Sequence, residues 1–526
     1  MSRRVPSLPI TTAEQAAARD RAAIAGGIPS FDLMVRAGTA TAAIVLREFS
    51  DRLSDGVAIF AGAGNNGGDA YIAAAQLLRA GIRVRLHAAE PPRTPDAMRA
   101  AALVTNRLVH GEPTGHERLA IDGLLGTGHR GALRGSIATA TERLARFHEA
   151  GARVVALDVP SGLDATTGEV AAGSVPAHTT LSYGTIKRGH LVARPHCGRL
   201  LLVDIGLEHH TQLDDGAWML ADASTLRSAI PTVPWDTWKT RQGIVGLVGG
   251  NEGMAGAVVL SARAALATGA GLVHAIVHKT SCPALQALVP QALAHEYHDT
   301  FSATSTCNAV GAGPGLGKGA EARAVLDSLL TATLPLVLDA DALNLLVVTA
   351  KEHALQTASL LSRHAQDGRA VVCTPHAGEF ARMIDRELPA ALADRVELAQ
   401  SFAMTSRCTV LLKGTPTVVC TSDGAAPVVI ARGTPALATG GSGDVLTGII
   451  ATLLAHGVTA VTAAVAGAWL HGRAAEIATA AHGTTRGVGL DRVIEALPHA
   501  WREIEQPASF PLYLLADLPS VVHLHG

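Results

Sequence analysis

Gly440-Gly441-Ser442-Gly443-Asp444 is the stretch that decides how the second half of this sequence folds. Its three glycines allow the backbone to approach a ligand closely. Apolar residues recur at helical spacing over 445–454, so a helix is predicted directly after the stretch, and Gly457 is its predicted stop. The start of such a helix presents free N–H groups and a positive dipole end to an anion. Asp444 puts a carboxylate where phosphate is expected. This placement favours a chemical role over the alternative of a simple helix cap.

Working outward from this stretch, strands alternate with helices along both halves of the chain. This alternation predicts parallel, doubly wound sheets. The predicted strands are 57–61, 84–87, 119–121, 154–157, 180–183, 200–203, 244–248, 273–277, 336–338, 371–373 and 410–412. We therefore predict an α/β fold: a Rossmann-like three-layer domain with a parallel sheet, followed by a second α/β domain. The expected bounds are 1–222 and 223–505, and residues 506–526 form an apolar tail of unassigned role.

The composition limits the classes of partner. Of the 526 residues, 48% are hydrophobic and 17% are charged, and the net charge is −2. A compact protein is expected, with neither nucleic acid nor membrane as a partner. The six cysteines form no CxxC pair, and the N-terminus lacks a secretory apolar run, which predicts a cytoplasmic location. The apolar tail makes a homo-oligomer the expected state.

Polar loops follow three predicted strands of the first half. Asn65-Asn66-Gly67-Gly68-Asp69 lies between a strand and a helix, and Asp122 and Asp158 each lie at or just beyond a strand end. Ligands bind at such strand ends in open α/β sheets. The alternative is that each carboxylate only caps a helix. Because the strands are predicted to be parallel, the three loops should meet at one edge of the sheet.

These loops, together with the segments DGLLGTG and DVPSGLD, resemble the NAD(P)H-hydrate epimerase family, also called the YjeF N-terminal domain, over about residues 10–215. The resemblance implies that Asn66, Asp122 and Ser161 supply oxygen ligands to a potassium ion, and that Asp158 contacts the reacting ring and moves protons. Lys187 matches a lysine of the family. The residues implied to hold the hydrated dinucleotide are Asn65, Asn66, Gly67, Gly68, Asp69, Gly126, Thr127, Gly128, His129, Arg130, Gly131, Ala132 and Asp158.

Further glycine loops and strand-end motifs mark the second half. They are GGNEGMAGA at 249–257, the loop 310–317, DADALN at 339–344, TPHAGE at 374–379, LKG at 412–414 and GGSGD at 440–444. Together they predict one polar cleft. The set resembles the ADP/ATP-dependent NAD(P)H-hydrate dehydratases, of ribokinase-like fold. The resemblance implies a hydrate site lined by Ala257, Gly313, His376 and Asp444, and an adenine-nucleotide site at Lys413, Gly414, Thr415, Pro416 and Gly443. Asp339, Asn344 and Glu379 would act through Mg²⁺.

The combined resemblance implies a bifunctional repair enzyme. One domain would epimerise the R- and S-hydrates of NADH and NADPH. The other would dehydrate the S form with ADP or ATP, giving AMP or ADP and phosphate, with Asp444 as the general base. Two alternatives are a vitamin or sugar kinase in the second half and a non-catalytic nucleotide-binding module in the first. A lone histidine such as His376 is more often structural than catalytic.

Overall fold

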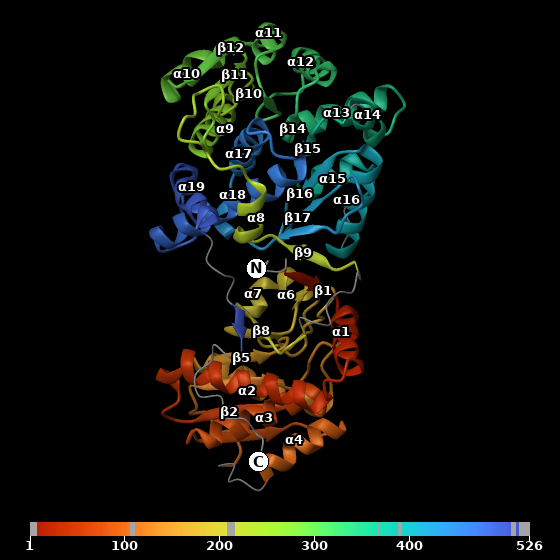
Figure 1. Ribbon diagram of the computed structural model, residues 1–526, viewed down its shortest axis with the longest axis vertical. Helices are drawn as coiled ribbons and strands as arrows, with labels where there is room; N and C mark the ends of the chain where they lie inside the picture. The colour runs from red at the N-terminus through yellow and green to blue at the C-terminus, as the bar shows by residue number, and fades with distance from the viewer. Residues whose placement is uncertain are drawn as a thin grey trace. The chain divides into compact units, whose positions relative to one another are not determined.

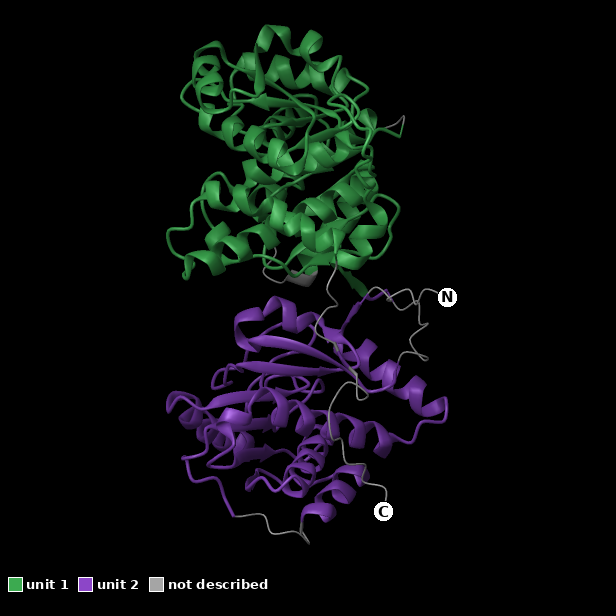
Figure 2. Ribbon diagram, turned by 60° about the vertical axis from the view of Figure 1, so that its left-hand side comes forward, with its two compact units in different colours: residues 1–7, 218–508 green, residues 8–217, 509–526 purple. Residues whose placement is uncertain are grey.

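The computed structural model describes residues 8–105, 111–207, 216–365, 368–387, 392–506 and 512–514. The chain divides into two compact units (Figure 2). Unit 1 comprises residues 218–508, and unit 2 comprises residues 8–217 together with the strand at 512–514. Among the described helices, none combines the length and the apolar character needed to cross a bilayer.

Unit 2 is built around a parallel sheet (Figure 1). Its strands are β2 (Val57–Ala61), β3 (Val84–Ala88), β4 (Leu119–Gly123), β5 (Arg153–Leu157), β6 (Thr179–Tyr183), β8 (Arg199–Asp204) and β19 (Leu512–Leu514). They lie in the order β19-β8-β6-β5-β4-β2-β3. A separate short pair joins β1 (Pro9–Thr11) to β7 (Ile186–Lys187). The helices are α1 (Ala13–Ala25), α2 (Ser30–Glu48), α3 (Asn65–Arg79), α4 (Pro95–Thr105), α5 (Gly135–Glu149), α6 (Arg188–Val192) and α7 (Arg194–Cys197).

Strand residues of unit 2 alternate between two apolar cores. Val57 and Ile59 of β2 pack with residues of α2, α3 and α4, whereas Ala58 and Phe60 pack with residues of α5. A sheet covered by helices on both faces needs apolar side chains on both faces of each strand, which explains why β2 is apolar throughout. The result is the predicted three-layer arrangement.

Unit 1 contains a larger sheet, most of which is also parallel. In sheet order its strands are β12 (Ala292–Glu296), β11 (Leu272–Val277), β10 (Ile244–Gly249), β13 (Ala309–Ala312), β14 (Leu336–Leu338), β15 (Val371–Cys373), β16 (Thr409–Leu412), β17 (Thr417–Cys420), β18 (Val428–Ile430) and β9 (Trp218–Leu220). The pairs β16–β17 and β17–β18 are antiparallel. This antiparallel extension is absent from the prediction of a purely parallel sheet.

Helices of five to 23 residues surround this sheet. The helices are α8 (Ala223–Ala229), α9 (Ala255–Thr268), α10 (Cys282–Leu288), α11 (Thr300–Thr304), α12 (Ala320–Thr331), α13 (Ala340–Glu352), α14 (Thr357–His364), α15 (Ala377–Met383), α16 (Leu392–Ser406), α17 (Ser442–Ala455), α18 (Ala460–His482) and α19 (Leu490–Glu505). The central helix α17 packs between α9 and α18. Its residues from Val445 to Ala455 are all buried, so it belongs to the core of the unit.

Two predicted boundaries need correction. Residues 310–317 were expected to form a loop, but the first part of this segment is the strand β13. A Cβ added at Gly311 would lie 3.0 Å from Thr447 Cγ2, so the strand needs glycine there to let α17 approach. The predicted helix after 440–444 begins inside the stretch, at Ser442, and Gly457 follows its end with a φ of 82°. Asp444 therefore lies in the first helical turn.

Part of the apolar tail, residues 512–514, forms a strand of the unit 2 sheet. Leu512, Tyr513 and Leu514 pair with Leu202, Val203 and Asp204, which makes β19 a parallel edge strand beside β8. Tyr513 is buried, and its hydroxyl donates to Glu48 at 2.6 Å. Most of the remaining tail lies outside the described residues.

Candidate active sites

The unit 2 site lies where the order of the strands reverses. β2 lies between β3 and β4, so the loops after β2 and β4 leave the sheet side by side. Gly62 N donates to Gly123 O at 3.1 Å, and a Cβ at Gly62 would lie only 1.8 Å from Leu124 O. A Cβ at Gly67 would lie 1.9 Å from Gly62 O. These glycines are needed because the backbones of the loops touch at the crevice where such sheets bind ligands.

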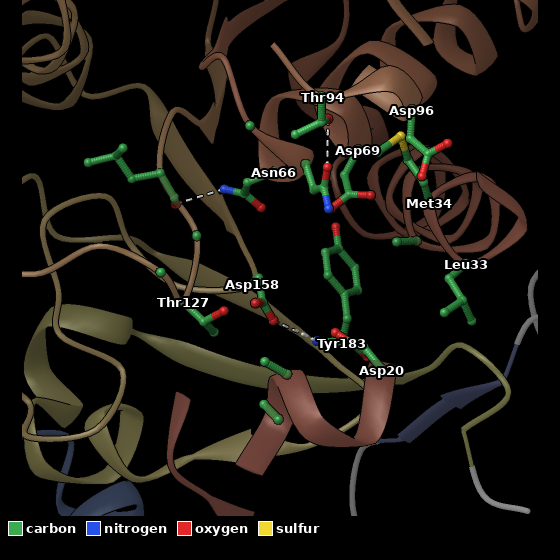
Figure 3. A pocket seen from close by; sticks show the side chains of 18 of the residues that line it. Asp20, Leu33, Met34, Asn66, Asp69, Thr94, Asp96, Thr127, Asp158 and Tyr183 are labelled. Carbon is green, nitrogen blue, oxygen red and sulfur yellow. Dashed lines mark hydrogen bonds between the residues drawn. The ribbon is translucent and has the colours of Figure 1, made fainter. Parts of the chain in front are cut away.

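A cavity of about 890 Å³ opens at this crevice (Figure 3). Of the residues predicted to bind substrate, it is lined by Asn65, Asn66, Asp69, Gly126, Thr127, Gly128, His129, Arg130 and Asp158. Gly67, Gly68, Gly131 and Ala132 are not part of the lining. Gly67 and Gly68 are buried behind it, where an added Cβ would clash with Gly62 O and with the Met34 side chain.

The three predicted potassium ligands are linked through the loop that follows β4, because Leu125 bonds to both Asn66 and Ser161. Asp122 is buried, and it accepts hydrogen bonds from Ser161 N at 2.8 Å and from Ser161 Oγ at 2.5 Å. Asn66 Nδ2 donates to Leu125 O at 2.8 Å, which leaves Asn66 Oδ1 buried and with no hydrogen-bond partner among the described residues. Burial raises the pKa of Asp122, against the hydrogen bonds from Ser161. An unpaired amide oxygen and a buried carboxyl group on neighbouring loops are oxygen ligands of the kind that a hard cation takes.

Asp158 has a strained backbone and an ionic partner. Its φ of 61° lies in the left-handed region, which non-glycine residues adopt at a cost of about 1–3 kcal/mol. Its carboxylate is held by the amine of Lys187, which is almost completely buried. The same amine donates to Ser182 Oγ at 3.2 Å and to Tyr183 O at 3.0 Å. The ion pair explains how a lysine is tolerated in the core.

Two further carboxyl groups border the same cavity. Desolvation at the cavity wall raises the pKa of Asp20 to about 6, although part of its side chain remains exposed. Burial and the charge of Asp158 raise the pKa of Asp69 well above its usual range. Figure 3 shows Asp69 pointing toward the hydroxyl of Tyr183, which hydrogen bonds to Thr41 Oγ1 at 2.6 Å. Asp20 was not predicted, because it lies in the middle of α1, outside every motif.

The unit 1 site also lies at a reversal of strand order. β10 lies between β11 and β13, and the loops after β10 and β13 are joined by hydrogen bonds. Gly250 N donates to Pro314 O at 2.9 Å, and Asn251 N donates to Gly315 O at 2.7 Å. Gly313 has a φ of 126°, and a Cβ there would lie 1.8 Å from Asp339 O. The predicted glycine loops therefore meet at one crevice.

A buried ion pair joins the residue that follows β14 to the residue that follows β16. Asp339 Oδ1 accepts from Lys413 Nζ at 2.7 Å, and Oδ2 accepts from Thr447 Oγ1 at 3.1 Å. Burial lowers the pKa of Lys413, but Asp339 and Glu379 outweigh it, so the net pKa is raised and the amine stays charged. A Cβ at Gly443 would lie 3.2 Å from Asp339 Oδ2 and 3.3 Å from Lys413 Nζ. Glycine is therefore required for α17 to begin directly above the pair.

Asp444 combines a helix N-terminus with a perturbed carboxyl group. It is the third residue of α17, whose N-cap Gly441 has a φ of 94°. Its carbonyl oxygen accepts from Ser261 Oγ at 2.8 Å, which ties α17 to α9. Burial, followed by the charge of Asp339, raises the pKa of Asp444 to about 7, against the effect of Lys413. A carboxyl group with this pKa can act as a base near neutral pH.

Three further predicted residues lie at or in the helices α15, α9 and α13. His376 caps α15: its Nδ1 accepts from Gly378 N at 3.0 Å, so its Nε2 carries the proton in the neutral ring, and the side chain is 55% exposed. The Gly315 turn packs against Ala257, since an added Cβ would lie 3.1 Å from Ala257 Cβ. Asn344 accepts from Arg382 Nη2 at 3.0 Å and so joins α13 to α15.

The described side chains do not form a cage for Mg²⁺. No group of three or more His, Cys, Asp or Glu residues among them is arranged as a metal site. Asp339 is engaged by Lys413 and Thr447, and Glu379 accepts from His376 N at 2.8 Å. The carboxylates predicted to act through Mg²⁺ are therefore committed to other partners.

Each of the two units matches the model of a known protein family. Residues 245–499 match the family model of NAD(P)H-hydrate dehydratase, and residues 30–189 match that of the YjeF-related protein N-terminus. A solved Bacillus subtilis structure is described as ADP/ATP-dependent NAD(P)H-hydrate dehydratase co-crystallized with ATP/Mg²⁺. It is 26% identical, covers 55% of this chain and 99% of its own chain, and has a TM-score of 0.47.

Full-length relatives carry both units. The bifunctional NAD(P)H-hydrate repair enzyme Nnr of Vibrio cholerae is 33% identical over 502 residues, covering 92% of this chain and 95% of the relative. The enzyme of the same name from Mycobacterium leprae is 35% identical over 481 residues, covering 88% and 93%. The chain therefore belongs to the family of bifunctional NAD(P)H-hydrate repair enzymes.

Proposed function

We propose that unit 2 epimerises the R- and S-hydrates of NADH and NADPH, and that unit 1 dehydrates the S form with ADP or ATP as co-substrate. The functional domains are then 1–222 and 223–505. The observation that carries the proposal is the geometry at Asp444, where a carboxyl group with a pKa of about 7 lies in the first turn of α17, beside Lys413. A helix N-terminus that can bind phosphate and a carboxylate that can act as a general base are thus placed together.

In unit 1 the first turn of α17 and Lys413 bind the phosphate, and Asp444 transfers the proton. Free N–H groups in the first turn of α17 bind the terminal phosphate, and Lys413 offsets its charge. Asp444 takes the proton of the substrate hydroxyl, and the hydroxyl oxygen then bonds to the terminal phosphorus while the bond to the rest of the nucleotide breaks. Loss of phosphate with its bonding electrons, together with a ring proton, returns the dihydronicotinamide.

Nucleotide binding is assigned to the loop from Lys413 to Pro416 and to Gly443. Lys413 N donates to Pro375 O at 2.9 Å, so this loop is anchored beside the TPHAGE motif. Because Asp339 and Glu379 are engaged by other groups, Mg²⁺ would be held by the nucleotide phosphates, as is usual for this ion. The hydrate lies on the other side of Asp444, against Ala257, Gly313 and His376.

In unit 2 the cavity holds the hydrated ring against Asp158. The loops of Asn65–Asp69 and of Gly126–Ala132 bind the dinucleotide, and the N-terminus of α3 faces its phosphates. Asp158 takes the proton of the substrate hydroxyl as the bond from its carbon to the ring nitrogen breaks, and the nitrogen keeps the bonding electrons. It returns the proton to the oxygen when that bond re-forms on the other face of the carbon. Asn66, Asp122 and Ser161 would hold potassium, which would supply positive charge next to the loop that binds the substrate.

One product analysis separates the proposal from a kinase. The protein is incubated with the S-hydrate of NADH and ADP, and the products are separated by chromatography. We expect NADH, AMP and phosphate in equal amounts, because phosphorylation and elimination occur at one site. Accumulation of a stable phosphorylated substrate without NADH would instead identify unit 1 as a small-molecule kinase.

The dehydratase reaction should depend on pH through Asp444. The base is active when it is ionised, and its pKa in the free enzyme is raised to about 7. We expect kcat/KM to fall about tenfold per pH unit below this value and to level off above it. Initial rates across a pH series measure the profile. A profile that stays flat as the pH crosses 7 would contradict the assignment.

Removal of potassium should lower both the activity and the thermal stability of unit 2. A cation present at about 100 times its Kd stabilises the folded state by about 2.7 kcal/mol. We therefore expect both the epimerase rate and the unfolding temperature to fall when K⁺ is replaced by tetramethylammonium. Asn66→Ala should abolish this response, whereas Asn65→Ala should keep it, because Asn65 Oδ1 instead accepts from Thr94 Oγ1 at 2.7 Å. Equal rates and unfolding temperatures in the two salts would exclude the cation site.

A further inference from the structure

The conformation of Asp158 requires support from its surroundings. This residue is not glycine, yet its φ of 61° lies in the left-handed region. A strained backbone of this kind persists only where neighbouring groups hold it. The neighbours of Asp158 therefore determine how its carboxylate is presented to the cavity.

All but one of its polar atoms are occupied by neighbours within the described residues. The backbone N–H donates to Leu181 O at 2.8 Å, and Oδ1 accepts from Tyr183 N at 3.2 Å and from the amine of Lys187. The backbone carbonyl accepts from His190 Nε2 at 2.9 Å. Only Oδ2 is left for a substrate, and Figure 3 shows the carboxylate facing the open cavity.

His190 also has both of its ring nitrogens committed. Its Nδ1 accepts from Lys187 N at 3.2 Å, so the proton of the neutral ring lies on Nε2, which donates to Asp158 O. The ring is completely buried. Burial lowers the pKa of His190 to about 3, so the ring is neutral and this pattern of donor and acceptor is fixed at neutral pH. The imidazole of His190 thereby links the backbone of Lys187 to the backbone of Asp158, the two residues that form the ion pair.

We propose that His190 is a positioning residue for epimerisation, which holds the Asp158 backbone so that Oδ2 alone faces the reacting ring. The proposal rests on the proposed function of unit 2. Asp158 performs the proton transfer, and His190 acts through it without contacting the substrate. The amide side chains of asparagine and glutamine are neutral like the ring, and each can replace one of its two bonds.

His190→Gln and His190→Asn each keep one of the two hydrogen bonds of the His190 ring and remove the other. The side chain of His190→Gln reaches the position of Nε2 and can still donate to Asp158 O. The side chain of His190→Asn reaches only the position of Nδ1, so it can accept from Lys187 N but loses the bond to Asp158. The control is His178→Leu, because His178 also accepts from a backbone amide, Val154 N at 3.0 Å, but lies before β6, at the amino end of that strand.

The experiment uses the full chain and measures kcat and KM for epimerisation, together with dehydratase turnover and thermal unfolding. In His190→Asn we expect kcat to fall on the order of 10²-fold with KM nearly unchanged, as for a misplaced catalytic group. We expect His190→Gln to recover most of the rate, and His178→Leu and dehydration to be unaffected. Equal kcat values in His190→Asn and His190→Gln would overturn the proposal. Absence of epimerisation in the unsubstituted chain would instead overturn the function of unit 2.

Discussion

Replacing Asp444 by asparagine will lower the dehydratase kcat by about 10²–10⁴-fold, the range that general-base catalysis contributes. The substitution keeps the size of the side chain and removes its ability to take the hydroxyl proton. Binding of ADP should be kept or strengthened, because a negative charge next to the phosphate site is lost. Turnover of the S-hydrate and binding of ADP, measured on the same protein, check the two parts of this expectation.

A matched control separates catalysis from helix electrostatics. Asp491 is also an acidic residue in the first turn of a helix, α19, and its carboxylate pairs with Arg263 at the surface. We expect Asp491→Asn to leave kcat unchanged. If Asp444→Asn kept the wild-type rate, the base assignment would be wrong, and the carboxylate would be only a first-turn acidic group.

The second large effect is expected in unit 2. Asp158→Asn should lower epimerisation by about 10²–10⁴-fold while dehydration of the pure S-hydrate continues. The same change removes the partner of the buried Lys187 amine, so thermal unfolding must be measured alongside the rate. Asp164→Asn is the control from the same DVPSGLD segment, since Asp164 only caps a turn through Thr166 N and Thr167 N. Epimerisation that survives in Asp158→Asn would place the proton transfer elsewhere in the cavity.

Much of the fold could be predicted because the strands are short apolar runs bounded by glycine or charge. The bounds of β2, β14 and β15 agree residue by residue with the prediction. The strand β13 was missed because Gly311 looks like part of a loop, and only the close packing of Thr447 and its neighbours against it explains the glycine. Likewise, α3 begins at Asn65, within the segment that was expected to lie between a strand and a helix, since residues with low helix propensity are tolerated in a first turn.

The candidate sites could be predicted only where a motif ends a strand or begins a helix. Asp158 and Asp444 were found in this way, and the structure gives each a physical perturbation: a left-handed backbone for the first and a raised pKa for the second. Asp20, His190 and Thr447 were missed. They lie within helices, where a lone polar residue resembles a surface or core position, and only the tertiary fold brings them to the sites.

The most direct test of the bifunctional assignment uses a mixture of R- and S-hydrates of NADH. The unsubstituted chain is incubated with the mixture, and the near-ultraviolet absorbance of NADH is followed with and without ADP. We predict complete recovery of NADH with ADP and none without it, whereas Asp158→Asn should stop once the S-hydrate is consumed. Recovery of NADH without any nucleotide, or identical end points for the unsubstituted and Asp158→Asn chains, would contradict the account.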